Sequence, residues 1–451
     1  MHIRYTPSSK GDFCASRAWT SPFFVVACFS VLKVSGADRS GRLLVRIKFS
    51  EWPAETLMTD RSPVILQVLP ALSTGGLERG AIEIAAAITQ AGGKAIVASK
   101  PGPLLIQLRH AGALHVPLNL KSKSPVAVLR RARDLQKLIR QQGVDLVHAR
   151  SRIPAWAAWL ACRREGIPLV TTWHGVHGAG WWGKKLYNSV LARGTRVIAI
   201  SNFIAGRLSG QYGVQSDRLR TIPRGADPSL FDPQKVSGER IQRLAEAWSV
   251  PHGARVILMP ARLTAWKGQR VLIEALKFLK QVSVAPLICV LVGPETDHKF
   301  ALSLGRRIQE LGLEDRVRFA GTCRDMPAAC ALASVVVAPS LRPEPFGRTL
   351  VEAQMMGKPV IGTAQGAMME TVLPGQTGLV VPPDNPQALA EALVGILSAD
   401  DETLAYLAEN AREHVLRNYT IRQMQSATLG VYDELLGTHL RASFDGQTDD
   451  N

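Results

Sequence analysis

The stretch SVVVAPSLRPEPFGRTLVEAQMMGKPV, residues 334–360, places a buried strand, a loop and a helix in immediate succession. Its first seven residues form an apolar, β-branched run that is typical of a parallel strand covered on both faces. Pro343, Pro345 and Gly347 indicate a loop, and the next residues have helical spacing until Gly357. Because open α/β sheets bind ligands beyond the carboxyl ends of their strands, this loop is a candidate site.

Two carboxylates lie in this stretch. Glu344 is in the loop, and Glu352 follows about one and a half turns into the helix. Side chains placed in this way could reach different hydroxyls of one polar ligand, although a loop acid and a solvated helix acid would have the same spacing. They do not suggest the facing pair of acids that glycoside hydrolysis requires.

A second candidate site lies upstream in ARVILMPARLTAWKGQRVLIEAL, residues 254–276. The pattern predicts a strand over 255–259, a short loop and a helix from about Lys267. Arg262 and Lys267 bring two cations to the start of that helix, and Gly268 lets the backbone approach closely. Cations beside exposed helical N–H groups favour a diphosphate. The spacing differs from that of a P-loop.

Alternating strands and helices continue through both halves of the chain. Strands are expected near 64–70, 144–148, 168–172 and 195–199, and again near 255–259, 286–292, 316–319, 334–338, 359–361 and 378–381. This alternation predicts an α/β protein with two Rossmann-like, doubly wound parallel-sheet domains.

Composition suggests where these domains begin and end. The predicted parts are a non-conforming N-terminal extension (1–60), an N-terminal domain (61–223), a proline-containing linker (224–253), a C-terminal domain (254–418), a last long helix (419–436) and a disordered tail (437–451).

Taken in order, the motifs resemble those of the retaining glycosyltransferases of family four, also called glycosyl transferases group 1. The resemblance covers roughly residues 63–436. The matching segments are Gly75-Gly76-Leu77-Glu78, Thr172-Trp173-His174-Gly175, Pro223-Arg224-Gly225-Ala226-Asp227, Arg262…Lys267-Gly268, Val292-Gly293, Glu344…Glu352, Gly366-Ala367-Met368-Met369-Glu370 and Thr377-Gly378-Leu379-Val380. Two positions depart from the family pattern: Ala367 replaces a usual glycine, and Arg224 replaces a usual asparagine.

The resemblance implies the GT-B architecture, in which two domains face a central cleft and the last helix crosses back to the N-terminal domain. It also implies a nucleoside-diphosphate sugar as donor. Arg262 and Lys267 would stabilise the leaving diphosphate, Glu352 would bind the ribose, and Glu344 and His174 would lie beside the transferred sugar. The donor would also be bound by Gly75, Gly76, Gly268, Gly293, Phe346, Gly347 and Arg348.

No cofactor and no metal site is expected. The chain contains no Asp-x-Asp motif, so the usual carboxylate site for a metal–nucleotide complex is missing. Its six cysteines are scattered without Cys-x-x-Cys spacing, which favours a reducing compartment and argues against structural zinc.

The positive charge is concentrated in one half of the chain. The formal net charge is +17, and residues 61–223 alone carry +17, against +3 for residues 1–60 and −3 for residues 224–451. Such a field favours an anionic partner: a phospholipid surface, a nucleic acid or a phosphorylated acceptor. Nucleic acid is disfavoured, because aromatic residues do not alternate with the charges and no recognition-helix signature is present.

The segment 178–187 combines Trp181 and Trp182 with Lys184 and Lys185. Membrane interfaces favour this mixture of aromatic and basic side chains. The basic residues 130, 131, 133, 137, 140, 163 and 164 would extend the same face. The alternative is that Trp181, Trp182 and Tyr187 pack into the core of the N-terminal domain or into an acceptor pocket.

Residues 1–57 do not fit the rest of the chain. Their apolar run at 22–34 imitates a signal peptide but is too short to span a bilayer. We expect Met58 to be the natural start, with a membrane tether or a signal peptide as alternatives.

These observations together predict a metal-independent, retaining hexosyltransferase that acts on a lipid-linked or lipopolysaccharide-type acceptor at the inner face of the cytoplasmic membrane. A transferase that makes a soluble glycoside, a basic nucleic-acid-binding protein and a non-catalytic sugar-nucleotide binder are the alternatives.

Overall fold

The computed structural model describes residues 33–37, 43–46, 61–73, 75–178, 180–279 and 286–447. It divides into two compact units, Met1–Arg61 and Ser62–Asn451. In the first unit, β1 (Lys33–Ala37) pairs antiparallel with β2 (Leu43–Arg46). The predictions for the apolar run and for the start at Met58 fall largely or wholly outside the described residues.

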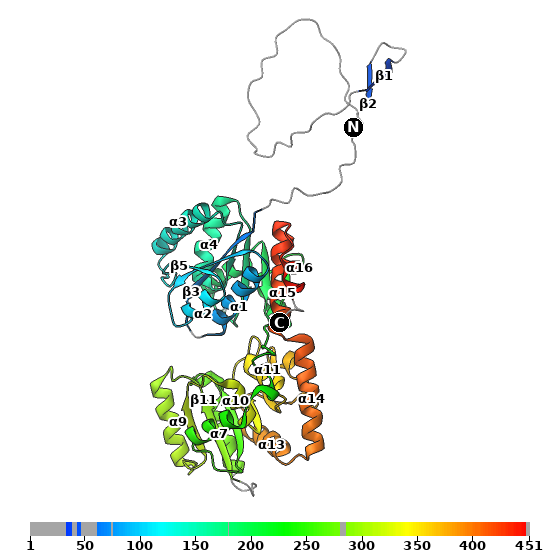
Figure 1. Cartoon of the computed structure of the whole chain (residues 1–451). Coiled ribbons are helices and arrows are strands. Elements are labelled where there is room, and N and C mark those ends of the chain that lie inside the picture. Colours follow the sequence, from blue (N-terminus) through cyan, green and yellow to red (C-terminus); the bar gives the residue numbers. More distant parts are fainter. Residues whose placement is uncertain are drawn as a thin grey trace. The chain divides into compact units, whose positions relative to one another are not determined.

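The second unit begins with a parallel sheet of seven strands (Figure 1). Its order is β5 (Leu114–Pro117), β4 (Lys94–Lys100), β3 (Val64–Ala71), β6 (Leu146–Ala149), β7 (Leu169–Trp173), β8 (Arg196–Ala199) and β9 (Leu219–Thr221). The helices around it are α1 (Gly76–Gln90), α2 (Leu105–His110), α3 (Pro125–Gln142), α4 (Arg152–Glu165), α5 (Trp182–Asn188) and α6 (Asn202–Tyr212).

A second parallel sheet of six strands follows. Its order is β12 (Val317–Gly321), β11 (Leu287–Val292), β10 (Arg255–Pro260), β13 (Val335–Ala338), β14 (Val360–Thr363) and β15 (Leu379–Val381). Its helices are α7 (Gly238–Ala247), α8 (Gln269–Leu279), α9 (His298–Glu310), α10 (Met326–Leu332), α11 (Arg348–Met355), α12 (Met368–Thr371), α13 (Pro386–Leu397) and α14 (Asp401–Asn418).

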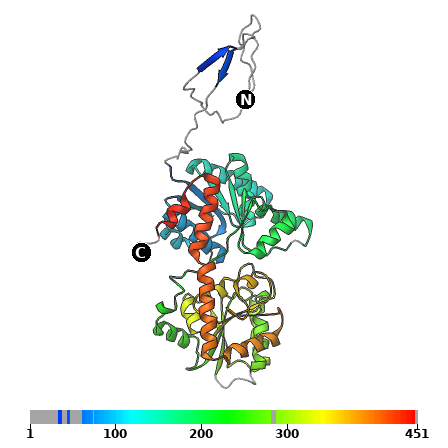
Figure 2. The ribbon, with the colours of Figure 1, turned by 90° about the vertical axis from the view of Figure 1, so that its right-hand side faces the viewer.

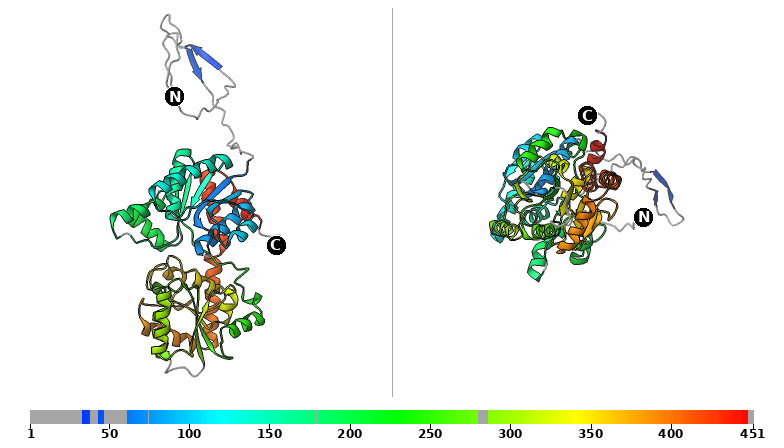
Figure 3. Two further views of the ribbon diagram at one scale, coloured as in Figure 1. Left: turned by 90° about the vertical axis from the view of Figure 1, so that its left-hand side faces the viewer. Right: turned by 90° about the horizontal axis from the view of Figure 1, so that it is seen from below.

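Helices cover both faces of each sheet (Figures 1 and 3). The central strands are therefore mostly apolar: Ile65, Leu66 and Val68 on β3 and Ile257 and Leu258 on β10 are fully buried. The prediction of two doubly wound parallel-sheet domains is confirmed.

The chain passes between the two sheets twice, and the two crossings lie side by side. Ala226 donates its N–H to the carbonyl of Tyr419 (2.9 Å), and Ile421 donates to the carbonyl of Ala226 (2.9 Å). A Cβ on Gly225 would lie 2.2 Å from the carbonyl carbon of Thr420, so only glycine fits between the two crossings.

The last long helix, α15 (Ile421–Leu436), lies against the N-terminal sheet and its helix α1 (Figure 2). Tyr432 on α15 is fully buried, with its hydroxyl 2.6 Å from His148 Nδ1. Glu434 forms ion pairs with Arg196 (3.0 Å) and Arg220 (2.8 Å).

The prediction that residues 437–451 are disordered is wrong for the part of the tail that the structure describes. Leu440–Asp445 forms helix α16, which packs on α15 and α1. The apolar spacing of Leu440 and Phe444 explains why, because both side chains enter the core beside α1, and Arg422 lies over the Phe444 ring at 4.5 Å.

Candidate active site

The two predicted loops meet at Gly268 and Pro339. Gly268 has φ +86°, and a Cβ there would lie 1.8 Å from the Pro339 carbonyl oxygen. Leu341 donates its N–H to the Trp266 carbonyl at 2.8 Å. The short 3₁₀ turn Ala265–Lys267 is thereby held against the loop that follows β13.

This contact brings Lys267 and Glu344 together. Lys267 Nζ lies 2.6 Å from Glu344 Oε1, and the Ser340 hydroxyl donates to the same oxygen at 2.6 Å. The Glu344 side chain is only 8% exposed. The two hydrogen bonds hold this buried carboxylate in place, and the carboxylate in turn orients the lysine.

Arg262 lies in the loop after β10, and Gly293 follows the neighbouring strand β11. Arg262 is exposed, and its backbone carbonyl accepts a hydrogen bond from Gln269 Nε2 at 2.8 Å. A Cβ on Gly293 would lie 2.1 Å from the Ala261 carbonyl oxygen. Among the described contacts, none joins the Arg262 guanidinium to the Lys267–Glu344 pair.

Glu352 belongs to a chain of charged groups that spans both domains. Arg348 Nε donates to Glu352 (2.9 Å), and its NH2 donates to Glu83 on α1 (2.9 Å). Glu83 also lies 3.4 Å from Arg224 NH2. The same Arg224 nitrogen donates to the Gly76 carbonyl at 2.8 Å. The predicted donor residues Gly76, Arg348 and Glu352 are therefore connected through Glu83 and Arg224.

Arg224 is almost completely buried, at 6% exposure. Burial lowers the pKa of its guanidinium to about 10, Glu83 opposes this shift, and the positive charges of Arg348 and Arg150 add to it. Its guanidinium lies against Gly80, where a Cβ would be 2.6 Å from NH2. The departure from the family pattern at this position is thus accommodated by a glycine on α1.

His174 follows β7, and both of its ring nitrogens are buried without a hydrogen-bond partner. Burial holds the pKa of its imidazole well below 6.5, and the nearby guanidinium groups of Arg224 and Arg150 add to this shift. The ring is therefore neutral near pH 7. His177 packs on the Trp173 ring at 5.2 Å, and burial lowers its pKa to about 4.

The glycines in the motifs after β13 and β14 adopt left-handed backbone conformations. Gly347, the residue before α11, has φ +86°, and Gly366 has φ +65°. Ala367 donates its N–H to the Glu344 carbonyl (3.0 Å) and has φ −74°, so an alanine is unstrained there despite the usual glycine. Phe346 is buried and contacts Tyr419 edge-to-face at 5.6 Å.

Sequence reasoning did not identify Glu370 as a contact between the domains. Its carboxylate accepts the N–H groups of Asn202 (2.8 Å) and Phe203 (2.6 Å) at the start of α6. The Ser201 hydroxyl donates to the Pro345 carbonyl (2.8 Å) in the same region. A carboxylate at a helix N-terminus is favoured by the exposed N–H groups and the helix dipole.

The two tryptophans of the segment 178–187 are exposed: Trp181 by 60% and Trp182 by 79%. Lys184, Lys185 and Leu186 on α5 are also exposed. Core packing of the tryptophan pair, the alternative considered from the sequence, is therefore not observed.

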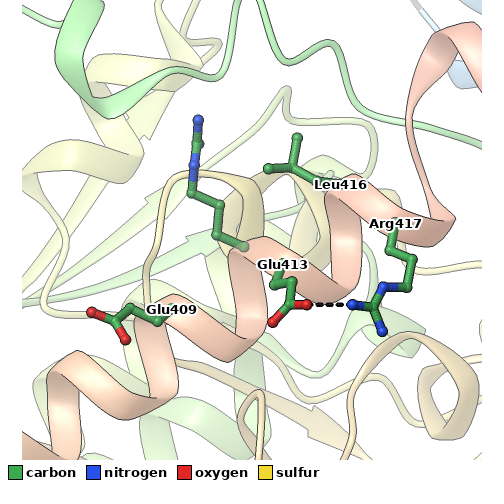
Figure 4. Close-up of a pocket in the computed structure, with 5 residues that line it drawn as sticks. Glu409, Glu413, Leu416 and Arg417 are labelled. Carbon is green, nitrogen blue, oxygen red and sulfur yellow. Dashed lines mark hydrogen bonds and ion pairs between the residues drawn. The ribbon is translucent and has the colours of Figure 1, made fainter.

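A separate surface hollow lies on α14 and is lined by side chains of that helix alone (Figure 4). Its Glu413 and Arg417 side chains form an ion pair with each other. None of the predicted site residues lines it.

Within the described residues, no group of three His, Cys, Asp or Glu side chains lies where it could hold a metal ion, and no helix is long and apolar enough to cross a membrane. Cys162, Cys289 and Cys330 are buried, and burial raises the pKa of each thiol.

Two family models match the chain in succession. The model described as Glycosyltransferase Family 4 matches residues 74–230, and the model described as Glycosyl transferases group 1 matches residues 241–414. Together they cover the C-terminal sheet, the N-terminal sheet except β3, and the two predicted loops.

The solved structures that resemble the chain include a glycosyltransferase from Rickettsia africae. It is 35% identical, with a TM-score of 0.77, and the match covers 84% of this chain and 100% of that one. Anabaena HepE in complex with UDP-glucose is 26% identical, with a TM-score of 0.72 and coverage of 82% and 100%.

A curated relative, D-inositol 3-phosphate glycosyltransferase from Salinispora tropica, is 30% identical over 322 residues. The match covers 65% of this chain and 65% of that protein, so this chain spans just under two thirds of the relative's length.

Proposed function

Because this chain belongs to the family four, or group 1, glycosyltransferases, we propose that it transfers a hexose from a nucleoside-diphosphate sugar to a lipid-linked or lipopolysaccharide-type acceptor. The configuration at the anomeric carbon is retained. The bond between this carbon and the diphosphate oxygen breaks, a bond to the acceptor oxygen forms, and the proton of the acceptor hydroxyl passes to the departing diphosphate.

The difficult part of this reaction is departure of the diphosphate, which gains negative charge as the sugar becomes cationic. Lys267 and Arg262 would stabilise that charge without a metal ion. The observation that supports this role is the 2.6 Å contact between Lys267 and the buried Glu344, which fixes the ammonium group before the donor arrives. Preorganised charges of this kind contribute on the order of 100- to 1,000-fold in rate.

Glu344 would act through its charge rather than as a nucleophile. Its Oε1 is already occupied by Lys267 and Ser340, and this arrangement suits a residue that positions the donor and stabilises a cationic sugar. Neutral His174, at the carboxyl end of β7, would hydrogen-bond to the transferred sugar.

Glu352 would accept hydrogen bonds from the ribose of the donor. Its Oε1 accepts a hydrogen bond from Arg348, which also contacts Glu83 in the N-terminal domain. Gly75, Gly76, Gly268, Gly293, Phe346 and Gly347 would let the backbone approach the same ligand.

The membrane part of the proposal rests on one observation: two exposed tryptophans stand beside two exposed lysines in the basic domain. Tryptophan prefers the interface between lipid and water, and each lysine near an anionic leaflet contributes about 1 kcal/mol. A protein held in this way would meet a lipid-linked acceptor at the inner face of the cytoplasmic membrane.

Flotation with vesicles tests this surface. Wild-type protein should bind vesicles that contain anionic phospholipid and should dissociate at high salt, because exposed charges are screened. The double variant W181A/W182A should bind at least about tenfold more weakly. Leu302→Ala, which removes an apolar side chain that is 53% exposed on α9, is the matched control and should bind like wild type. Equal binding by all three proteins would remove the membrane proposal.

A soluble phosphorylated acceptor is the second candidate, favoured by the name of the Salinispora relative, D-inositol 3-phosphate glycosyltransferase. It predicts that turnover of a water-soluble acceptor gains nothing from vesicles. Measuring transfer with and without vesicles separates the two acceptor classes.

A further inference from the structure

A group of buried cationic side chains lies at the carboxyl edge of the N-terminal sheet, and the mechanism above does not use all of it. Arg150 follows β6 and His174 follows the adjacent strand β7. Arg224 joins them from the crossing after β9. Parallel strands bring these positions to the same edge of the sheet, where ligands bind in this type of fold.

Each of the three side chains has a buried nitrogen without a hydrogen-bond partner. These atoms are NH2 of Arg150, Nε of Arg224 and both ring nitrogens of His174. Arg150 and Arg224 are only 4% and 6% exposed. Buried polar atoms are rarely left without partners, so several in one place need an explanation.

The charges around these atoms do not balance. Arg150, Arg224 and Arg348 contribute three positive charges, and Glu83 and Glu352 contribute two negative ones. Arg150 donates its Nε–H to the uncharged Gln67 at 2.8 Å, and among the described ion pairs none joins it to a carboxylate, although the charge of Glu83 opposes the lowering of its pKa by burial. A buried guanidinium without an acid partner is costly unless an anion neutralises it.

Local structure keeps both arginines in place. Gln67 lies on the central strand β3 and donates its Nε2–H to the Ala81 carbonyl on α1 (2.9 Å), which leaves its carbonyl oxygen directed to Arg150. Gly80 leaves room for the Arg224 guanidinium. The arrangement is therefore preorganised by two elements of the N-terminal domain.

We propose that Arg150, Arg224 and His174 form a subsite for an oxyanion, either a carboxylate or a phosphate, carried by one of the two sugar substrates. Two arginines present forks of N–H donors that match either group, and the neutral imidazole supplies one further donor. This inference rests on the proposed function and adds the charge of the substrate to it. The oxyanion could belong to the donor, as a uronic acid, or to the acceptor, as a sugar phosphate.

Titration calorimetry on the full chain distinguishes these sources. One arm compares UDP-glucuronate with UDP-glucose, and the other compares glucose 6-phosphate with glucose in the presence of UDP. Inorganic phosphate is titrated alone as the smallest probe. In one arm the anionic ligand should bind at least about tenfold more tightly than its neutral counterpart, and phosphate should compete with it.

Two variants assign this preference to the proposed residues. Arg224→Asn installs the residue usual in the family, and Arg150→Gln retains a hydrogen-bonding side chain without the charge. Each should reduce the preference for the anionic ligand to near one. Arg79→Asn, at an exposed position on α1, should keep it. Circular dichroism of each variant checks that it is folded.

Nucleotide binding in the same samples separates this inference from the proposed function. If UDP binds but neither arm shows a preference for the anionic ligand, the subsite does not exist. A preference that survives in both Arg224→Asn and Arg150→Gln would also overturn it. If no nucleoside diphosphate binds to the wild-type protein, the proposed function itself fails.

Discussion

At the residue scale, the Lys267–Glu344 pair gives the strongest argument about chemistry. A lysine beside a buried carboxylate would normally be explained as an ion pair that stabilises the fold. Here the pair lies where two loops converge beyond the carboxyl ends of β10 and β13. The neighbouring residue Gly268 must be glycine, because a Cβ there would lie 1.8 Å from the Pro339 carbonyl oxygen of the other loop. Position and glycine together favour a site for an anionic ligand.

Lys267→Ala should therefore lower kcat/KM by about 100- to 1,000-fold, because the leaving diphosphate loses a fixed positive charge. Lys277→Ala, which removes an exposed lysine near the end of α8, is the control and should leave turnover unchanged. Steady-state assays with purified donor measure both. A loss below about threefold in Lys267→Ala would contradict the assigned role.

The buried histidines make the stability of the fold depend on pH. Burial holds the pKa values of His148 and His174 well below 6.5, so both stay neutral in the folded state while the unfolded chain takes up protons below about pH 6.5. Stability should thus fall as the pH falls from 7 to 5.5, by about 1 kcal/mol for each such histidine. The hydrogen bond from Arg140 lowers the pKa of Glu165, so carboxylates of this kind change the stability of the fold only at pH values below this range.

Denaturant unfolding of the wild type and of His148→Gln at the two pH values measures this effect. The variant should be less stable at both, because it loses contacts with Tyr432 and Thr172, but its loss of stability on acidification should be about 1 kcal/mol smaller. An identical pH dependence for both proteins would contradict the assignment of a neutral His148.

At the scale of single elements, the C-terminal sheet was predictable. Six apolar runs were assigned as strands and correspond to β10 to β15, because strands buried on both faces contain few polar residues. Residues 94–117 show the limit of this signal, since β4, α2 and β5 were not assigned. β5 has no fully buried residue, so its sequence carries little of the pattern.

The loop residues of the candidate site were also recognisable, but their partners were not. Glu344, Glu352 and Lys267 stand in motifs with glycine and proline. Glu83 is an ordinary helix acid in the sequence, and its importance comes from Arg224 and Arg348, which lie 141 and 265 positions away. Side-chain packing over such distances leaves no local pattern.

Gly268 provides a test of the loop geometry. Gly268→Ala should destabilise the fold by several kcal/mol, because a Cβ at φ +86° would lie 1.8 Å from the Pro339 carbonyl oxygen. Gly253→Ala has a similar φ of +72° but open space around its Cβ, so it should cost only about 1 kcal/mol. Thermal unfolding of both variants isolates the close contact, and equal losses would argue against it.

At the scale of the whole molecule, specific polar contacts among the described residues connect the two domains. Arg348 joins Glu352 to Glu83, Glu370 caps α6, and the two chain crossings are hydrogen-bonded to each other. Glu352 is proposed to bind the ribose of the donor, and its partner Arg348 also contacts Glu83 in the N-terminal domain. Binding of the donor and contact between the domains should therefore influence one another.

A double-mutant cycle measures the contact between the domains. Glu83→Gln and Arg348→Gln should each destabilise the folded protein, and the double variant should lose less than the sum, with a coupling of about 1–3 kcal/mol. Denaturant unfolding of the four proteins supplies the values. Strict additivity would show that the 2.9 Å contact between these side chains contributes nothing to stability.

The central claim is a metal-independent nucleoside-diphosphate site that depends on Lys267. A thermal-shift measurement in the presence of EDTA tests it directly, with UDP, GDP, ADP and their common sugars added to wild type and to Lys267→Ala. A ligand at about 100 times its dissociation constant adds roughly 2.7 kcal/mol of stability, which should raise the Tm by a few degrees. We expect one nucleotide to stabilise the wild type and to leave the variant almost unaffected. Stabilisation that disappears in EDTA, or that is equal in both proteins, would contradict the claim.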